Sequence, residues 1–386
     1  MESSAQIRIQ KPAGEKVTIQ LAGLQPGTDA QSQQFMQTLR ANLDRSGWFD
    51  VVPAGQGEVA VSGRIRLRGN ELQVEATVVG TVNREQYINQ RYHQPSANSR
   101  RLAQRLADDI VEAVIGYRGI ASTQIVFVGA VDRHRELFLI SPDGSGLTQL
   151  TSDGNWAVSP RWGATRRQLT YTGYLNRFAD VFLVDLETGN RSPLSAQSGL
   201  NAGGAISPNG EELAVILSKD GNPELYVQNL QSGRLTRLTN TQNANEASPS
   251  WSPDGQEIVY VSDQVGRPHL YIISRRGGAP RRVTTRGSEN VAPDWGTNGL
   301  IAFSHRIGRQ NQIGILDPQS GQISYISDPR GGDFEDPSWA PNGRHIVVGR
   351  REDFRSDLYI LDTAGDPPLR LTTTRGDWFS PAWSPQ

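Results

Sequence analysis

From about residue 120 onward, apolar and polar residues alternate in short runs that are separated by Gly, Pro, Asn and Asp. The alternation has the period of two that half-buried β-strands show, as in EIVYVS at 257–262 and HIVVGR at 345–350. Turns such as SPDG at 252–255 stand between the runs. Their Pro sets φ at the first turn position, and Asp and Gly accept the conformation that closes a hairpin. This part of the chain is predicted to be all β.

The strand pattern repeats with a fixed period. Five Pro-x-Trp tripeptides and one variant mark the same point in every repeat: PRW at 160–162, GAI at 204–206, PSW at 249–251, PDW at 293–295, PSW at 337–339 and PAW at 381–383. Successive markers lie 44 or 45 residues apart. Each period contains four predicted strands, which is the organisation of one β-propeller blade. The marker tryptophans are therefore interpreted as core residues between neighbouring blades.

The two ends of this region predict how the ring closes. Residues 123–154 supply the second, third and fourth strands of a blade, but no Pro-x-Trp marker precedes them at the expected spacing. The unpaired segment SPAWSP at 380–385 supplies the missing first strand. We therefore predict a six-bladed β-propeller over residues 119–386, closed by the C-terminal strand so that no sheet edge stays open.

Residues 15–118 lack this period and are predicted to form a small α/β domain. A strand is expected at 17–23 and a hairpin at 58–80 with its turn at 69–70. Apolar residues at helical spacing predict helices at 28–47 and 96–116. The fold class is thus a multidomain α/β and all-β protein, with the α/β domain first.

Composition excludes several classes of protein. The 39 basic and 40 acidic side chains nearly cancel, so we expect no nucleic-acid binding. No run approaches 18 apolar residues, so we expect no direct membrane insertion. Cysteine is absent, which removes disulfides, thiolate metal sites and cysteine nucleophiles. The start MESSAQIRIQ contains no apolar signal core, and a leader is expected to be absent from this chain.

A search for catalytic chemistry is mostly negative. The sequence has no G-x-S-x-G, no Walker A motif and no dinucleotide fingerprint. Its five histidines are scattered, and each PDG or PNG turn offers a single side-chain oxygen, whereas calcium loops supply several. We expect no catalytic residue, no metal site and no cofactor. A calcium ion in the propeller channel is kept as an open alternative.

The loops are the better candidates for function. In a propeller, the connections into the first strands and the loops between second and third strands lie at one mouth of the ring. The former carry Asn155, Trp156, Asn201, Asn245, Glu246, Glu289, Asn290, Glu335, Asp336, Asp377 and Trp378. The latter carry Arg133, Arg135, Arg177, Arg267, Arg309 and Arg355. This mixture of polar groups, arginines and exposed aromatics favours protein recognition over a small apolar substrate.

Several segments, in this order, resemble one known family. They are QIRIQKPAG at 6–14, LRANLDRSGWFD at 39–50, VSGRIR at 61–66, RRLAQRLADDIVEAVIGYRG at 100–119, the blade segments at 218–239 and 262–284, and the final PAWSP. Together they cover essentially the whole chain and resemble the TolB family of periplasmic proteins in the Tol-Pal cell-envelope system.

The resemblance implies a non-enzymatic, monomeric periplasmic protein that supports outer-membrane integrity and cell division. It implies that the mouth residues named above bind the lipoprotein Pal. It also implies that residues 1–14 form a mobile tail whose Gln6, Ile7, Arg8 and Ile9 contact TolA, by adding a strand to a partner sheet. Bacteriocins and other envelope proteins are further expected partners.

Two alternative classes stay open on the sequence alone. One is the propeller module of a peptidase-like or lyase-like enzyme, which shares WSPDG repeats but needs a catalytic site that the chain does not display. The other is a generic sensor or scaffold propeller whose α/β domain binds a different partner.

Overall fold

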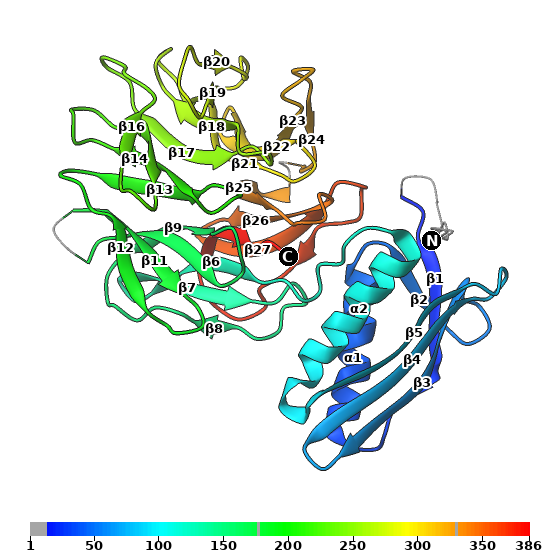
Figure 1. Ribbon diagram of the computed structural model, residues 1–386. Helices are drawn as coiled ribbons and strands as arrows, with labels where there is room; N and C mark the ends of the chain where they lie inside the picture. Colours follow the sequence, from blue (N-terminus) through cyan, green and yellow to red (C-terminus); the bar gives the residue numbers. More distant parts are fainter. Residues whose placement is uncertain (1–13, 176–177, 329–330) are drawn as a thin grey trace, which may run out of the picture. The chain divides into compact units, whose positions relative to one another are not determined.

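The computed structural model describes residues 14–175, 178–328 and 331–386, and these form two compact units (Figure 1). The first unit extends to Ser122 and the second begins at Thr123, four residues after the predicted boundary. The buried Asp108 explains this difference, because its carboxylate accepts hydrogen bonds from the backbone N–H groups of Ala121 (2.7 Å) and Ser122 (2.9 Å). The linking segment is thereby held to a helix of the first unit.

The first unit is a five-stranded sheet of order β2-β1-β3-β4-β5 with two helices on one face (Figure 1). Strand β1 pairs in parallel with β2 and β3, and the remaining neighbours are antiparallel. The elements in chain order are β1 (Val17–Gln25), α1 (Ala30–Arg45), β2 (Phe49–Val52), β3 (Val59–Arg68), β4 (Glu71–Gly80), β5 (Gln86–Pro95), the short 3-10 helix η1 (Ser96–Asn98) and α2 (Ser99–Ile115).

Local signals determine where these helices begin and end. Asp29 caps α1, since its Oδ1 accepts a hydrogen bond from the Ser32 backbone N–H at 2.8 Å. Gly116 ends α2 in the left-handed conformation with φ of 88°. Strands β2 and β5 were not anticipated, because β2 has only four residues and β5 buries only Ile88 and Tyr92 among polar neighbours.

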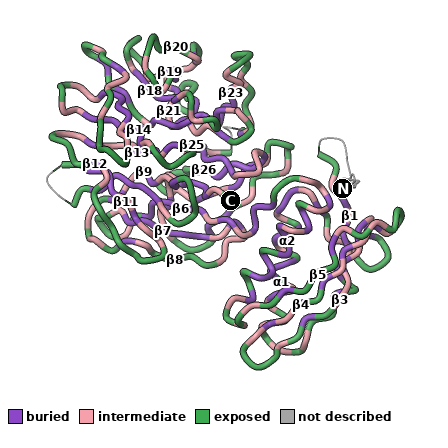
Figure 2. Tube along the Cα trace, viewed as in Figure 1, coloured by how far each residue is buried: buried purple, intermediate pink, exposed green. Residues whose placement is uncertain are grey.

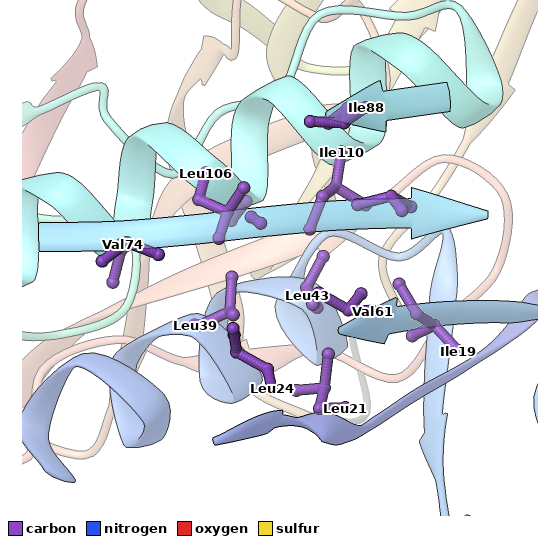
Figure 3. Packing of buried hydrophobic residues seen from close by; sticks show 14 of the residues in the cluster. Ile19, Leu21, Leu24, Leu39, Leu43, Val61, Val74, Ile88, Leu106 and Ile110 are labelled. Atoms are coloured by element: carbon purple, nitrogen blue, oxygen red, sulfur yellow. The ribbon is translucent and has the colours of Figure 1, made fainter. Parts of the chain in front are cut away.

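The core of the first unit lies between the sheet and the helices (Figure 3). Every third or fourth residue of the helices points to the sheet, so the apolar residues at helical spacing in α2, Leu102, Leu106, Ile110 and Val114, are all buried. They meet alternate residues of β1, β3 and β4, which the pleat directs to the same face. Central members of this cluster are Ile19, Leu39, Leu43, Val61, Val74, Leu106 and Ile110.

The second unit contains six four-stranded antiparallel sheets arranged as blades of a ring (Figure 1). The sheet that closes the ring combines β6 (Ile125–Val131), β7 (His134–Ile140) and β8 (Thr148–Gln149) with the last strand β29 (Trp378–Trp383). The other five use consecutive strands: β9 (Ala157–Trp162), β10 (Gln168–Gly173), β11 (Asp180–Asp185) and β12 (Arg191–Ser195); β13 (Asn201–Ile206), β14 (Glu212–Leu217), β15 (Glu224–Asn229) and β16 (Leu235–Arg237); β17 (Glu246–Trp251), β18 (Glu257–Ser262), β19 (His269–Ser274) and β20 (Arg281–Arg282); β21 (Glu289–Trp295), β22 (Ile301–Ile307), β23 (Gln310–Leu316) and β24 (Ile323–Tyr325); β25 (Asp333–Trp339), β26 (His345–Glu352), β27 (Arg355–Asp362) and β28 (Leu369–Arg370).

The marker tryptophans pack between blades, as predicted. Trp162, Trp251, Trp339 and Trp383 are buried, and Trp295 is half-buried. Two of the indoles hydrogen-bond to the neighbouring blade: the Trp251 Nε1 donates to the Ala205 carbonyl at 2.8 Å, and the Trp162 Nε1 donates to the Ala382 carbonyl at 2.9 Å. The first three strands of each blade are mostly buried or half-buried, whereas the fourth strands and the loops are largely exposed (Figure 2). The Pro-x-Trp motif is thus a structural repeat.

The PDG turns use their own side chains to close. In the turn at 252–255, the Ser252 hydroxyl donates to the Asp254 carboxylate at 2.6 Å, and Gly255 has φ of 67°. The hydrogen bond from Ser252 is the main reason why the pKa of Asp254 lies below its usual value. The carboxylate is therefore engaged within its turn.

The C-terminal strand closes the ring through hydrogen bonds to residues about 260 positions earlier in the chain. β29 pairs antiparallel with β6, with Trp383 opposite Ile125 and Trp378 opposite Gly129. Beyond the strand, the Ser384 N–H donates to the Gln124 carbonyl at 2.8 Å, and the Trp383 indole donates to the Thr123 hydroxyl at 2.8 Å. These contacts leave the edge of β6 covered.

Deleting residues 381–386 is expected to open the ring. The deletion removes Trp383 and half of β29, which exposes apolar surface on two blades and frees the edge of β6. Loss of a large buried side chain alone costs about 3–5 kcal/mol. Thermal unfolding should show a much lower melting temperature or aggregation, whereas removing only Pro385 and Gln386 should have little effect. An unchanged melting curve for the longer deletion would refute closure by β29.

Candidate partner-binding site

One irregular residue in each first strand shapes the centre of the ring. The residue three positions before each marker has positive φ, between 47° and 66°: Ser159, Gly203, Ser248, Ala292, Asp336 and Ser380. In every blade the pairing between the first and second strands shifts register at this point, which is a β-bulge. The following residue is Pro in five blades. Pro has no backbone N–H, so within a sheet it is confined to bulges and edges, where no ladder hydrogen bond is lost.

The bulges line a small central channel with a volume of about 70 Å³. Residues of all six blades contribute, and the polar side chains are those of Ser159, Arg161, Ser248, Asp336 and Ser380. The lining has one carboxylate and one guanidinium, and no group of three or more His, Cys, Asp or Glu side chains suited to a metal occurs in the described part of the chain. This lining does not provide the several acidic oxygens that calcium prefers.

The start of each first strand lies at one end of the ring, which we call the mouth. Strand pairing places the loops between second and third strands at the same end, since Glu246 pairs with Ser262 and Asp333 pairs with Arg351. The predicted mouth residues that the structure describes therefore come from one end of the ring. Their side chains fall into two groups, one buried and one exposed.

The buried group occupies the position five residues before each marker. Ala157, Asn201, Glu246, Asn290, Phe334 and Trp378 stand there, with exposed fractions of only 0 to 6%. The sequence interpretation placed four of these side chains, Asn201, Glu246, Asn290 and Trp378, on the surface of the mouth, and the structure instead places them in the interior. The pleat explains this, because side chains of successive strand residues point to opposite faces.

These buried side chains hold the mouth loops. The Asn201 amide oxygen accepts from the Gln197 N–H at 2.8 Å, and its NH₂ donates to the Gln197 carbonyl at 2.8 Å, which ties down the preceding loop. Asn290 lies between two buried imidazoles, with Nδ2 3.1 Å from His269 Nδ1 and Oδ1 2.8 Å from His305 Nδ1. Burial lowers the pKa of both histidines.

Glu246 forms a buried carboxylate pair with Glu224. Burial, followed by the charge of Glu224, raises the pKa of Glu246 to about 7. Burial alone would also raise the pKa of Glu224, but hydrogen bonds from Thr239, Thr241 and Arg237 lower it below the usual value. Glu224 therefore ionises first as the pH rises, and Glu246 keeps its proton up to about pH 7. The Ser262 hydroxyl donates to Glu246 Oε1 at 2.9 Å, which fixes the side chain at the base of the mouth.

The second group is at least partly exposed. Its members are Asn155, Trp156, Asn245, Glu289, Glu335, Asp336 and Asp377. Ion pairs hold two of the carboxylates, since Glu289 lies 3.1 Å from an Arg306 nitrogen and Glu335 lies 3.0 Å from an Arg351 nitrogen. Asp377 accepts a hydrogen bond from the Ser356 N–H at 2.9 Å. Exposed ion pairs contribute little stability, so these groups can exchange partners at low cost.

The predicted arginines mostly reach solvent. Arg133, Arg267, Arg309 and Arg355 are exposed, while Arg177 and the tail residues Gln6, Ile7, Arg8 and Ile9 lie outside the described residues. Arg135 differs, because its guanidinium lies 4.7 Å from the Trp156 ring and 5.0 Å from the Phe379 ring. These three side chains come from β7, from the loop before β9, and from β29, so the cluster crosses the junction where the ring closes.

The sequence interpretation missed most of the apolar component of the mouth, of which it named Trp156 but no other exposed side chain. Exposed large hydrophobic side chains occur on its loops and at the end of β22: Trp156, Tyr174, Leu175, Phe178, Val265, Ile307 and Phe354. Phe354 is 99% exposed and Phe178 is 62% exposed. The signal in the sequence was one or more large apolar residues within or beside a polar loop that joins a second strand to a third. Exposed apolar groups beside arginines are the chemistry of protein interfaces.

The Glu246–Glu224 pair predicts a pH-dependent stability. A carboxyl with a raised pKa stabilises the fold fully below its ordinary pKa of 4.5, and this contribution is lost as the pH rises through about 7. Gln at position 246 stays neutral at every pH. The free energy of unfolding of Glu246→Gln at pH 8 should therefore exceed that of the wild type by at most about 3 kcal/mol, with little difference at pH 4.5. Denaturant unfolding at several pH values measures this. Glu257→Gln in the paired strand controls for loss of a carboxylate, and equal pH slopes of wild type and Glu246→Gln would contradict the assignment.

Comparison with known proteins agrees with this architecture. The TolB beta propeller domain family matches residues 111–386. The Tol-Pal system protein TolB of Gluconobacter oxydans is 31% identical over 412 aligned residues, covering 99% of this chain and 89% of that protein. The protein of the same name from Desulfosudis oleivorans is 27% identical over 199 residues, covering 52% of this chain and 44% of that protein.

The fold agrees with a solved structure over both units. The crystal structure of TolB from Acinetobacter baumannii has a TM-score of 0.84 and 23% identity, and the match covers 96% of this chain and 97% of that one. No helix in the described part of the chain is long and apolar enough to cross a bilayer. The family match and the near full-length relative lead to one conclusion. The chain belongs to the TolB family, the non-enzymatic β-propeller components of the Tol-Pal system.

Proposed function

We propose that this protein acts in the periplasm as an adaptor that binds Pal through the mouth of its propeller and TolA through its N-terminal tail. In this role it supports outer-membrane integrity and cell division. The observation that carries the Pal assignment is the set of exposed apolar side chains on the mouth loops, next to exposed arginines. Membership of the TolB family supports the choice of partners.

The mouth has the two features that a protein partner requires. Its exposed aromatic residues can each bury a large area with little loss of side-chain freedom, and arginines add hydrogen bonds around them. The buried polar side chains beneath, Asn201 and Asn290, hold the loops in one arrangement before a partner arrives. A surface that is already ordered loses less entropy on binding. The polar residues Asn245 and Glu289 would then lie at the rim of the interface.

Phe354→Ala provides the sharpest test of the Pal site. This side chain is 99% exposed, so the substitution removes apolar contact surface without disturbing the fold. Pal binding, measured by calorimetry, should weaken by at least about tenfold, which corresponds to about 1.4 kcal/mol. Leu147→Ala is the matched control, because Leu147 is also exposed but precedes β8 at the opposite end of the ring. Equal affinities of both variants for Pal would argue against a Pal-binding site at the mouth.

The TolA assignment is tested separately. Removing residues 1–12 should abolish binding of TolA and leave the affinity for Pal unchanged, since the two partners are assigned to different parts of the chain. A pull-down with each purified partner gives the readout. Equal loss of both partners would contradict separate sites. Failure to bind Pal or TolA in the full chain would instead favour a generic scaffold propeller.

A further inference from the structure

The residue just before each marker usually connects one blade to the next. Three such residues are polar, and each accepts a hydrogen bond from the backbone N–H of the next marker tryptophan: Ser250 from Trp295 (3.0 Å), Asp294 from Trp339 (2.7 Å) and Ser338 from Trp383 (3.0 Å). Two are alanines, Ala205 and Ala382, whose carbonyls accept from the next indole. Five of the six positions therefore serve contacts between blades.

Arg161 occupies the sixth position and breaks this rule. Among the described residues only its backbone carbonyl accepts a side-chain hydrogen bond, from the Thr170 hydroxyl at 3.5 Å, and no hydrogen bond or ion pair involves its guanidinium, which lines the central channel. The next blade has Ile206 in place of the marker tryptophan, so no indole is available there. The two blades are joined instead by the Thr170 hydroxyl, which donates to the Gly204 carbonyl at 2.6 Å. The ring does not need an arginine at this position.

The rest of the channel lining suits an anion near Arg161. Ser159 and Ser248 line the channel through their bulges, and their hydroxyls have no hydrogen-bond acceptor among the described residues. The single carboxylate, Asp336, accepts from the Ser380 hydroxyl at 2.7 Å and does not pair with Arg161. The channel volume of about 70 Å³ is room for roughly five waters. A small oxyanion with some water fits this space.

We propose that the channel binds a small oxyanion, a carboxylate or an inorganic ion such as sulfate, with Arg161 as its charged ligand. A guanidinium offers paired N–H donors that match two oxygens of such a group, and serine hydroxyls supply further donors. The anion comes either from solution or from an acidic side chain of a partner at the mouth. The assignment of the anion to a partner side chain rests on the proposed binding of Pal.

The test follows the side-chain Nε–Hε signal of Arg161 by NMR, identified by its absence from the spectrum of Arg161→Ala. Ala is already present at this position in two blades, so the variant is expected to fold. Titration with sodium acetate or sulfate, against chloride at equal ionic strength, should move the signal to saturation. The signal of Arg276, an exposed arginine assigned through Arg276→Ala, should not saturate. A linear shift for Arg161, or the same shift for both arginines, would overturn the proposal.

A second variant places the anion within the channel. Asp336→Asn removes the negative charge and keeps an oxygen for the Ser380 hydroxyl, so the apparent Kd for sulfate should fall by at least about threefold. An unchanged Kd would show that the anion binds elsewhere. The affinity of Pal for Arg161→Ala decides whether the anion is a free ion or an acidic side chain of the partner. Weaker binding, with competition by sulfate in the wild type, identifies a carboxylate of the partner. Unchanged binding beside a saturable sulfate signal identifies a free ion.

Discussion

The structure of the second unit depends on burial of each blade against the next around a closed ring. A single four-stranded sheet of this length cannot cover both of its apolar faces, and it presents an open edge. Closure removes both problems at once, since every blade then has two neighbours. The hydrogen bond from the Trp162 indole to the Ala382 carbonyl shows the consequence: residues 220 positions apart in the chain stabilise each other. Stability of any one blade therefore requires the C-terminal strand.

The repeated bulge in the first strands converts this regular ring into a site. In a strand without a bulge, side chains would alternate regularly between the two faces of the sheet along its whole length. The extra residue shifts the register, so that Ser159, Asp336 and their equivalents line the channel. The residues two positions earlier point into the blade. Positive φ at non-glycine residues costs of order 1–3 kcal/mol each, and the surrounding ladder supplies the compensation.

At the mouth, buried polar side chains hold the loops in place, while the side chains at the surface are free to adapt to a partner. Buried groups such as Asn201 and Asn290 hold the loops through several hydrogen bonds each, whereas the partly exposed Glu289 and Glu335 take part in surface ion pairs. Apolar side chains such as Phe354 and Phe178 are largely exposed. This division is suited to recognition of another protein, in agreement with a family whose members carry out no catalysis.

Much of the fold could be predicted from the sequence because its determinants are local and repeated. The Pro-x-Trp spacing, the PDG turns and the strand alternation identified six blades, and the unpaired SPAWSP segment identified the closing strand. The helices at 28–47 and 96–116 were also visible, with Gly116 as a stop signal and either Thr28 or Asp29 as the cap of the first helix. Strands β2 and β5 were missed, since a short strand and a polar edge strand leave no periodic signal.

The functional surface could be predicted only in part. The sequence by itself determined which loops lie at the mouth, because strand order and loop position follow from the repeat. Only the tertiary structure decided that Asn245 is exposed while its neighbour Glu246 is buried beside Glu224, and that Arg161 enters the channel. The physical reason is that the direction of a side chain depends on bulge position and on contacts with the next blade, and neither is encoded in the residue type alone.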